Sequence, residues 1–455
     1  MSLLSVQIKP ASNRFSSKNI LTYLIIGAVA CLALGVFTSV ALCAGYHILL
    51  LVPGSACLAC SFRRNGWKAL PASSWALLAL IGIGVISCLI NWDSMQSPLR
   101  GLFKLKYFAF GILGLMALRH VISRGVSKKV VRGLLHLFFA SIIISVIYGL
   151  TATFADFDLV TWQKGQFDRV GGLTRTIRFG YGMGMVLPVL LTLWLRRREW
   201  ANWFDVRLLT LALAMGLVGL MLTQARGALL GLLCAVPLVL YFYRPKAGYW
   251  VGGVCGFAIV LLAVGNYLGE ERIAILLPGK TQGSSAGMLR GFESMNVRLS
   301  HYKAALYGIQ ERPVFGFGMR GYPQHVPRIK RQHGLKEDSS DTTHAHNTFL
   351  EIGANLGILG LVAFLAWLVL WGWESRKRHD AVAVCVLPFL LAFVVSGQFE
   401  YLFLANNAFL IFFLYALSSS ITGLSKTDQE KEDDCFQPIK YVEVRAEKTT
   451  AAPGI

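Results

Sequence analysis

The chain has 455 residues, of which 55% are hydrophobic and only 15% are charged, and its mean hydropathy is +0.55. A soluble globular protein carries about a quarter charged residues, so this composition excludes a water-soluble domain and indicates a protein whose solvent is lipid. The net charge of +20 comes mostly from Lys and Arg in short loops between apolar runs, so it does not indicate nucleic-acid binding.

Twelve apolar runs are long enough to cross a bilayer, because a spanning helix needs roughly 20 mostly apolar residues. The runs occupy 20–39, 41–60, 71–90, 101–118, 133–152, 178–195, 208–224, 227–243, 248–268, 346–372, 381–398 and 403–421. The two weakest breaks are the one after the first run and the one at 224–227. The first run follows basic residues, as in a signal peptide. It is long enough to span, however, and no small-residue cleavage site follows, so we expect an uncleaved first helix.

The distribution of basic residues predicts the topology. Loops that carry Lys or Arg mark the cytoplasmic side, and alternate loops contain Arg63, Arg64, Lys68, Arg119, Arg124, Lys128, Lys129, Arg132, Arg196, Arg197, Arg198, Arg207, Arg244, Lys246, Arg376, Lys377 and Arg378. The opposite short loops, near 91–100 and 399–402, carry almost none. We therefore expect an inner-membrane protein with both termini in the cytoplasm. Residues 1–19 form the N-terminus, 20–424 form the transmembrane domain and 425–455 form a polar, disordered tail.

A long periplasmic loop is expected at 269–343. Six apolar residues recur in it at helical spacing, namely Phe292, Met295, Leu299, Tyr302, Leu306 and Ile309. This spacing predicts an amphipathic helix that lies on the membrane surface or caps a cavity. Pro313 and the glycines that follow it predict a turn-rich stretch after the helix. No cysteine lies in this loop, so disulfides are not expected.

Four of the arginines expected on the periplasmic side, where the charge rule disfavours them, are candidates for binding an anion. Arg226 lies in the weak break between two central spans, and Arg298 lies on the amphipathic helix. Arg175 and Arg178 lie where the segment 153–177 meets its span. The planar guanidinium group suits phosphate, and two or three arginines can hold a pyrophosphate. The alternatives are arginines that snorkel at helix ends or that bind lipid headgroups.

Polar residues also open and close the last spans. His344, His346 and Asn347 precede a span that carries Glu351 about one turn deeper. A histidine here can accept a proton from a sugar hydroxyl near neutral pH, and Glu351 can fix its tautomer or bind a cation. Glu400, between the last two spans, is either a base or the partner of an arginine. The alternatives are a helix cap at Asn347 and plain surface histidines.

Two further patterns are interpreted as structural, and a metal site is not expected. Residues 316–321 match the glycine pattern of a dinucleotide-binding loop, but no buried strand precedes them, no helix is expected to follow them, and they are expected outside the cell. Gly353 and Gly357 form a GxxxG pattern, which predicts close helix packing. The His-x-His pair has no further ligand cluster at metal-binding spacing.

Together these motifs resemble the O-antigen ligase and O-antigen polymerase superfamily. The resemblance covers roughly residues 165–405 and depends on the order of the motifs. They are Arg226-Gly227-Ala228, Arg298, Pro313-Val314-Phe315-Gly316-Phe317-Gly318, His346-Asn347-Thr348-Phe349-Leu350-Glu351 and Leu356-Gly357-Ile358-Leu359-Gly360. The His-x-His-Asn form and the chain length look more like ligases than polymerases. Glu400 departs from the pattern, since some ligases have aspartate at that position.

The resemblance implies an all-α, polytopic, membrane-embedded glycosyltransferase of class C type. Its donor would be O-antigen linked to undecaprenyl diphosphate, and its acceptor would be a sugar hydroxyl of lipid A–core. The transfer would be inverting and independent of metal, with no cofactor, nucleotide or nucleic acid; the other partners would be membrane lipids. His346, Arg226 and Glu400 would be catalytic. Arg298, Arg175, Arg178, His344, Asn347 and Glu351 would bind substrate.

Other functions are kept as alternatives. An O-antigen polymerase uses the same donor with a second lipid-linked glycan as acceptor, and a protein O-glycosyltransferase is the next possibility. From a different class, a secondary transporter or flippase predicts broken helices in matching halves and charges near mid-membrane. Lys104 and Lys106, inside an expected span, are the only hint of a transporter.

Overall fold

The structure is a computed structural model that describes residues 17–155, 157–158, 163–164, 171–200, 202–254, 256, 297–337, 344–377, 381–404 and 406–421. Several sequence-based expectations lie outside these residues. They are the tail at 425–455, the parts of the expected loop at 269–296 and 338–343 with Phe292 and Met295, and most of the expected span at 248–268.

The described chain is built almost entirely from helices. The long ones are α1 (Ser17–Thr38), α2 (Val40–Asn65), α3 (Ala72–Ile90), α5 (Lys106–Ser123), α6 (Lys128–Ala155), α7 (Thr176–Leu195), α9 (Val206–Thr223), α10 (Arg226–Tyr243), α15 (Thr348–Arg376), α16 (Ala381–Ser396) and α17 (Asn406–Ile421). The short elements are η1 (Gly66–Ala69), η2 (Trp92–Ser94), α4 (Pro98–Lys104), α8 (Arg197–Trp200), α14 (Tyr322–Gln332), and the paired strands β1 (Phe157–Asp158) and β2 (Gln163–Lys164).

These helices confirm the expected fold class, an all-α polytopic membrane protein. Within the described residues, nine helical stretches are long and apolar enough to cross a membrane. α16 and α17 are shorter, with 16 residues each, and both coincide with expected spans. α4 and α5 together occupy the span expected at 101–118. Every expected span except the one at 248–268 therefore corresponds to a described helix or helix pair.

Both weak breaks between spans are real. Ser39 separates α1 from α2, and its side chain caps α2 by accepting a hydrogen bond from the Leu42 N–H at 3.4 Å. Gln224 ends α9 in the left-handed region with φ 55°. A helix cannot continue through such a residue, so α9 and α10 are separate helices.

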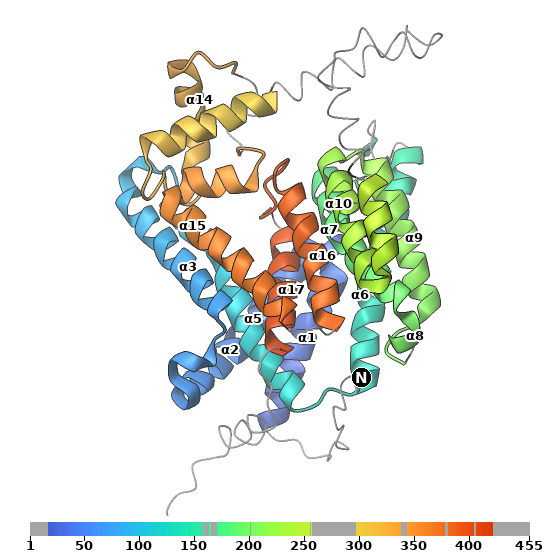
Figure 1. The fold of residues 1–455 in the computed structure, drawn as a ribbon. Helices are drawn as coiled ribbons and strands as arrows, with labels where there is room; N and C mark the ends of the chain where they lie inside the picture. Colours follow the sequence, from blue (N-terminus) through green and yellow to red (C-terminus); the bar gives the residue numbers. More distant parts are fainter. Residues whose placement is uncertain are drawn as a thin grey trace, which may run out of the picture.

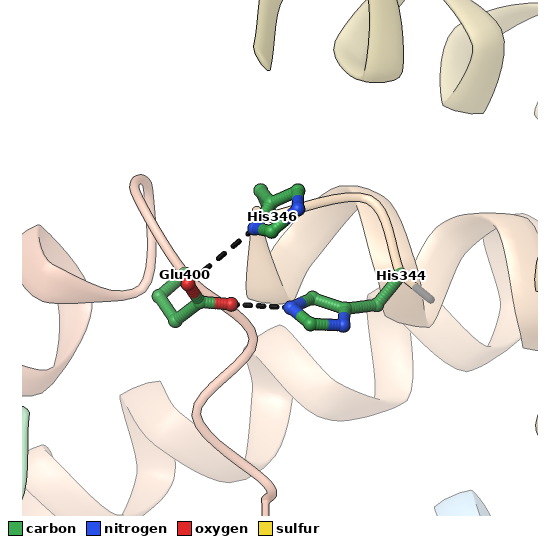
Figure 2. A group of neighbouring side chains, drawn as sticks. All are labelled: His344, His346 and Glu400. Atoms are coloured by element: carbon green, nitrogen blue, oxygen red, sulfur yellow. Dashed lines mark hydrogen bonds and ion pairs between the residues drawn. The ribbon is translucent and has the colours of Figure 1, made fainter. Parts of the chain in front are cut away.

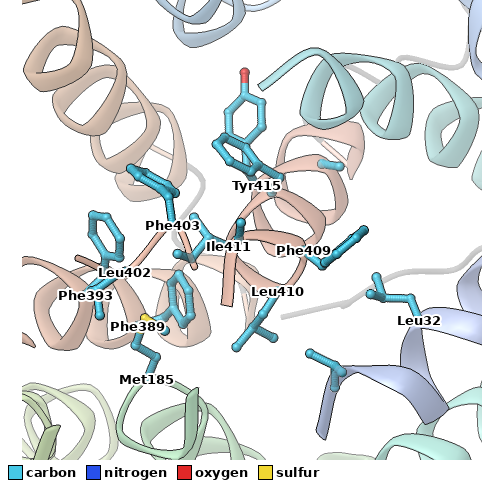
Figure 3. Close-up of a cluster of buried hydrophobic side chains, with 14 of the residues drawn as sticks. Leu32, Met185, Phe389, Phe393, Leu402, Phe403, Phe409, Leu410, Ile411 and Tyr415 are labelled. Atoms are coloured by element: carbon cyan, nitrogen blue, oxygen red, sulfur yellow. The ribbon is translucent and has the colours of Figure 1, made fainter. Parts of the chain in front are cut away.

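The helices form a bundle in which α17 is central (Figure 1). α17 packs against α5, α10 packs against α16, and α15 packs against α3. The core between α1, α7, α16 and α17 is aromatic and aliphatic, as Figure 3 shows for Leu32, Met185, Phe389, Phe403 and Phe409. α14 lies at one end of the bundle, and α8 lies at the other. We call the end that carries α14 the loop end.

α15 is broken at Gly357, which has φ 70° and ψ −171° inside the helix. The break frees backbone groups, and the turn that follows Pro313 satisfies them. The Ile358 N–H donates to the Pro313 carbonyl at 2.7 Å, and the Phe317 N–H donates to the Ala354 carbonyl at 3.1 Å. Buried backbone polar groups must be paired in this way. Residues 313–318, the Pro-x-x-Gly-x-Gly motif, thus pair with the backbone groups that the break in α15 leaves free. We call this segment the plug.

This arrangement corrects the interpretation of the GxxxG pattern. A Cβ added to Gly357 would lie 2.2 Å from the Val314 carbonyl oxygen, and one added to Gly353 would lie 2.8 Å from the Ile309 side chain. The close approach is therefore to residues 309–314, which come from the long loop, and not to a neighbouring span.

The helix predicted in the long loop is present over residues 297–311, and its position on the membrane surface or over a cavity stays a prediction. Leu299 and Leu306 are each 50% exposed, whereas Ala304 and Ala305 are fully buried. The buried face packs in a small second core with Phe317, Tyr322 and Val326, among others. Small side chains let the helix approach α14 closely, so they take the buried face in place of the leucines.

We expect Gly357→Ala to destabilise the folded protein, because alanine at this positive φ is strained by about 1–3 kcal/mol and its Cβ would collide with Val314. Thermal unfolding of the purified protein in detergent measures the effect. Gly82→Ala is the matched control, since an added Cβ at Gly82 in α3 meets nothing within 4 Å. Equal melting temperatures for the two variants would contradict the prediction.

Candidate active site

The start of α15 is tied to the loop between α16 and α17. Asn347 caps α15, and its Oδ1 accepts from the backbone N–H groups of Phe349 and Leu350 at 2.9 and 3.1 Å. Its amide Nδ2 donates to the backbone and side-chain oxygens of Gln398, at 3.2 Å each. The Thr348 hydroxyl donates to the Glu400 carbonyl at 2.8 Å. These bonds hold residues 398–400 against the residues that precede α15.

The two histidines share one carboxylate as a result (Figure 2). His344 Nε2 lies 2.5 Å from Glu400 Oε1, and His346 Nδ1 lies 3.4 Å from Glu400 Oε2. The Tyr401 N–H also donates to Glu400 Oε1, at 3.0 Å. The Glu400 side chain is only 3% exposed, and the histidine side chains are 17% and 18% exposed. The structure thus brings together three of the predicted site residues, which come from segments more than 50 positions apart.

The charges in this group follow from its hydrogen bonds. Burial on its own lowers the pKa of His344, but the hydrogen bond and the negative charge of Glu400 raise the pKa on balance. Burial likewise opposes ionisation of Glu400, yet the hydrogen bonds from both histidines lower its pKa well below the usual range. Glu400 is therefore a carboxylate at neutral pH, and its charge favours the protonated form of His344.

The geometry also fixes the tautomer of His346. A carboxylate can only accept hydrogen bonds, so Nδ1 of His346 carries the proton that faces Glu400. Nε2 then keeps its lone pair, on the side of the ring away from the carboxylate. His346 adopts a left-handed backbone conformation with φ 51°, which is uncommon outside glycine and clusters at functional sites. The arrangement can present a neutral imidazole base to a ligand.

Glu351 holds the histidine segment from below. It is 2% exposed, and it accepts hydrogen bonds from the Ala345 N–H at 2.8 Å and from Asn355 Nδ2 at 2.7 Å. Ala345 lies between the two histidines, so this carboxylate fixes their backbone. In the structure, Glu351 and Asn347 thus make contacts that position other residues. Their predicted contact with substrate stays a prediction.

Arg226 and Arg298 belong to the surroundings of Glu400. Arg298 and Glu400 both interact electrostatically with the hydroxyls of Tyr181 and Tyr302. Arg226 starts α10 directly before Gly227, where an added Cβ would lie 2.6 Å from the Tyr181 hydroxyl. Sequence reasoning did not identify either tyrosine as a site residue. Tyr181 sits in an apolar span, and Tyr302 was assigned to the hydrophobic stripe.

Arg175 and Arg178 belong to a different neighbourhood. Arg178 interacts with Arg175, with Tyr107 and with Lys104. Arg320, which sequence reasoning also missed, interacts with Lys104 as well. The only sequence signal for it was a cation inside the glycine pattern at 316–321, in which Gly316, Gly318 and Arg320 all have positive φ. That stretch forms turns, but α14 begins directly after it at Tyr322, so the expectation that no helix follows the glycine pattern was wrong.

The histidine pair does have a third metal-ligating neighbour, contrary to the spacing argument. The ligand atoms of His344, His346 and Glu400 all lie within 4.8 Å of one another. The spacing argument missed Glu400 because it is remote in sequence. The carboxylate of Glu400 already accepts hydrogen bonds from both imidazole rings, so its hydrogen-bonding needs are met without a metal ion. We retain metal independence as a prediction.

Comparison with known proteins supports the resemblance over part of the chain. Residues 211–365 match the O-antigen ligase family. This range includes Arg226, Arg298 and both histidines, while Glu400 lies beyond it. The chain is also similar to an uncharacterized protein of Haemophilus influenzae, with 21% identity over 212 residues, or 43% of this chain and 51% of that protein. The chain thus spans about half the length of that relative. The resemblance to the O-antigen ligase superfamily is confirmed, and the chain carries a domain of the ligase or polymerase type.

The ion pair predicts a pH dependence of stability. The raised pKa of His344 stabilises the fold fully below the ordinary value of 6.5, and this contribution is lost as pH rises through the folded-state pKa. The lowered pKa of Glu400 stabilises the fold fully above 4.5, and that contribution is lost as pH falls through its folded-state pKa. We expect the melting-temperature difference between wild type and Glu400→Gln to be largest between these two values and to shrink at alkaline pH.

The matched control for this measurement is Glu199→Gln, which removes a partly exposed ion pair with Arg196 at 3.7 Å. Exposed pairs contribute little to stability, so this variant should melt close to wild type at every pH. A difference for Glu400→Gln that is the same at pH 6 and pH 9 would show that the pair is not ionised as described.

We expect transfer activity to survive removal of metals. The purified protein, treated with EDTA and passed into metal-free buffer, should keep its rate and hold much less than one divalent ion per chain by mass spectrometry. Loss of activity that a divalent ion restores would overturn the prediction. In that case the His344–His346–Glu400 group would be the first place to seek the ion.

Proposed function

We propose that this member of the O-antigen ligase superfamily transfers O-antigen from undecaprenyl diphosphate to a sugar hydroxyl of lipid A–core. The observation that carries the proposal is the pairing of His346 with Glu400 beside Arg298 at the loop end of the bundle. A base, its orienting carboxylate and nearby cations are what a transfer from a diphosphate to a hydroxyl requires.

His346 acts as the general base. Its Nε2 accepts the proton of the acceptor hydroxyl while the hydroxyl oxygen attacks the anomeric carbon of the donor. The bond between that carbon and the diphosphate oxygen breaks, and undecaprenyl diphosphate leaves with the bonding electrons. In-line attack inverts the anomeric configuration. Glu400 keeps the proton on Nδ1 and stabilises the imidazolium that forms, as carboxylates do for catalytic histidines elsewhere.

The arginines act on the leaving group. Arg226 and Arg298 come from separate elements, α10 and the helix at 297–311. A guanidinium group can bind a phosphate through two parallel hydrogen bonds. Two such groups hold the diphosphate and stabilise the negative charge that grows on it as the glycosidic bond breaks. The energy for transfer is already stored in the diphosphate link, so no nucleotide is needed.

The basic loops support a periplasmic location of this site. Lys and Arg are concentrated in the loops that alternate with those of the loop end, and such loops stay in the cytoplasm. The histidines and Glu400 then face the periplasm in the inner membrane. O-antigen polymerisation fits the same chemistry with a lipid-linked acceptor, so the acceptor is what an experiment must determine. A transporter is not favoured, because the break in α15 is plugged by the chain's own loop.

Lipopolysaccharide from cells that lack the gene, complemented with His346→Ala, tests the proposal. Loss of a general base lowers a rate by about 10²–10⁴-fold, so this variant should give no O-antigen ladder while long glycan accumulates on the lipid carrier. His333→Ala is the control, since His333 is exposed at the end of α14 and stacks on Tyr307. It should restore the ladder.

Other outcomes contradict the proposal in different ways. Core that carries a single repeat in the deletion strain means that the protein is a polymerase. An unchanged ladder in the deletion strain means that it acts on a different glycan. Full rescue by His346→Ala, with the protein normally inserted, would remove His346 from the mechanism.

A further inference from the structure

Four cations from separate segments gather beside the histidine group. Lys104 ends α4, Lys106 starts α5, Arg178 lies in the first turn of α7, and Arg320 lies in the turn before α14. Lys104 interacts electrostatically with the other three. We call these four residues the cation cluster. Lys104 and Lys106 were the only sequence hint of a transporter, and the proposed transfer reaction does not use them.

Backbone geometry builds this cluster. α4 and α5 are separated at Leu105, so that both lysines stay near one aromatic ring. Each ammonium nitrogen lies 5.5 Å from the centre of the Tyr107 ring. The Met319 carbonyl packs so closely on α4 that a Cβ added to Gly101 would lie 2.4 Å from it. This contact, one helical turn before Lys104, brings the neighbouring Arg320 to the lysines.

Among the residues that the structure describes, no acidic side chain forms an ion pair with the cluster. Cations inside a membrane protein are costly unless they are paired, and by default they mark a substrate or ion path. Four cations that packing holds close together therefore favour the binding of an anion.

The cluster is separate from the arginines beside Glu400. Arg298 and Glu400 both interact electrostatically with Tyr181 and Tyr302. Arg320 instead interacts with Tyr401, and Arg178 interacts with Tyr107. The Tyr401 ring lies 6.0 Å from the His344 ring, so the histidine group borders the cluster as well. A transfer reaction brings two substrates to one base, and the structure has two cationic neighbourhoods next to that base.

We infer that the cation cluster is a second anion subsite, which binds a phosphate group on the acceptor while Arg226 and Arg298 hold the donor diphosphate. The inference depends on the proposed function for its assignment to the acceptor. The shared chemistry is a phosphate dianion, which suits two lysines and two arginines. Lipid-linked donor and phosphorylated acceptor are the two sources of such a group, and kinetics can separate them.

The test uses the full-length protein in nanodiscs, with a phosphorylated lipid A–core acceptor and the same acceptor after phosphatase treatment. We expect wild type to prefer the phosphorylated acceptor by at least tenfold in kcat/KM. Lys104→Gln and Arg320→Gln should lose that preference and keep the donor KM. Lys303→Gln, an exposed change on the helix at 297–311, is the matched control and should behave as wild type.

The kinetic outcomes assign the source of the anion. A raised donor KM in Lys104→Gln and Arg320→Gln, with unchanged acceptor preference, would overturn the acceptor assignment and give the subsite to the donor diphosphate. Unchanged kinetics for both substrates in both variants would overturn the subsite itself. Arg226→Ala provides the comparison for a defect on the donor side.

A binding measurement separates this inference from the proposed function. Inorganic phosphate should raise the melting temperature of wild type and of Arg226→Ala, but not that of the double variant Lys104→Gln/Arg320→Gln. If wild type binds phosphate in this way and yet transfers nothing to lipid A–core, the proposed function fails and the anion subsite stands. If phosphate stabilises wild type and the double variant equally, the subsite is wrong.

Discussion

The broken helix α15 is the constraint on which the rest of the loop end depends. A helix interrupted inside a membrane protein leaves backbone groups that must find partners, and here the segment after Pro313 provides them. The plug is also tied to α3, because Ser87 donates to the Asn355 carbonyl at 3.2 Å and Asn91 donates to the Gly316 carbonyl at 3.1 Å. The helix at 297–311 and α14 lie on either side of this plug in the sequence. The hydrogen bonds at the break in α15 therefore hold both helices against the bundle.

The geometry of the histidine group also depends on the start of α15. Asn347 caps the first turn of α15, and its side-chain amide donates a hydrogen bond to the Gln398 carbonyl. Glu400 is thereby carried to a histidine pair whose backbone is fixed by Glu351. The two carboxylates thus have different tasks. Glu351 accepts from the Ala345 N–H and the Asn355 amide, and Glu400 is shared by the two imidazole rings. The left-handed His346 is strained on its own, and these surrounding bonds are what maintain it.

Much of the fold was predictable, because lipid demands long apolar runs and these are visible in any sequence. The breaks at Ser39 and Gln224 were also visible. Contacts between distant segments were not: no spacing rule connects His344 with Glu400, or Arg320 with Lys104. The partners of the GxxxG glycines and the protein-facing side of the helix at 297–311 were not predictable for a related reason. Which face of a helix is buried depends on how closely its neighbour must approach. The small side chains of Ala304 and Ala305 allow a close approach to α14 that leucines would prevent.

The cation cluster has a mechanical consequence. Its members come from α4, α5, α7 and the turn before α14, and like charges repel one another. An anion bound at the inferred subsite would offset this repulsion and draw the four segments together. Part of the binding energy therefore goes into closing the scaffold, which makes the substrate a structural component of the site it occupies.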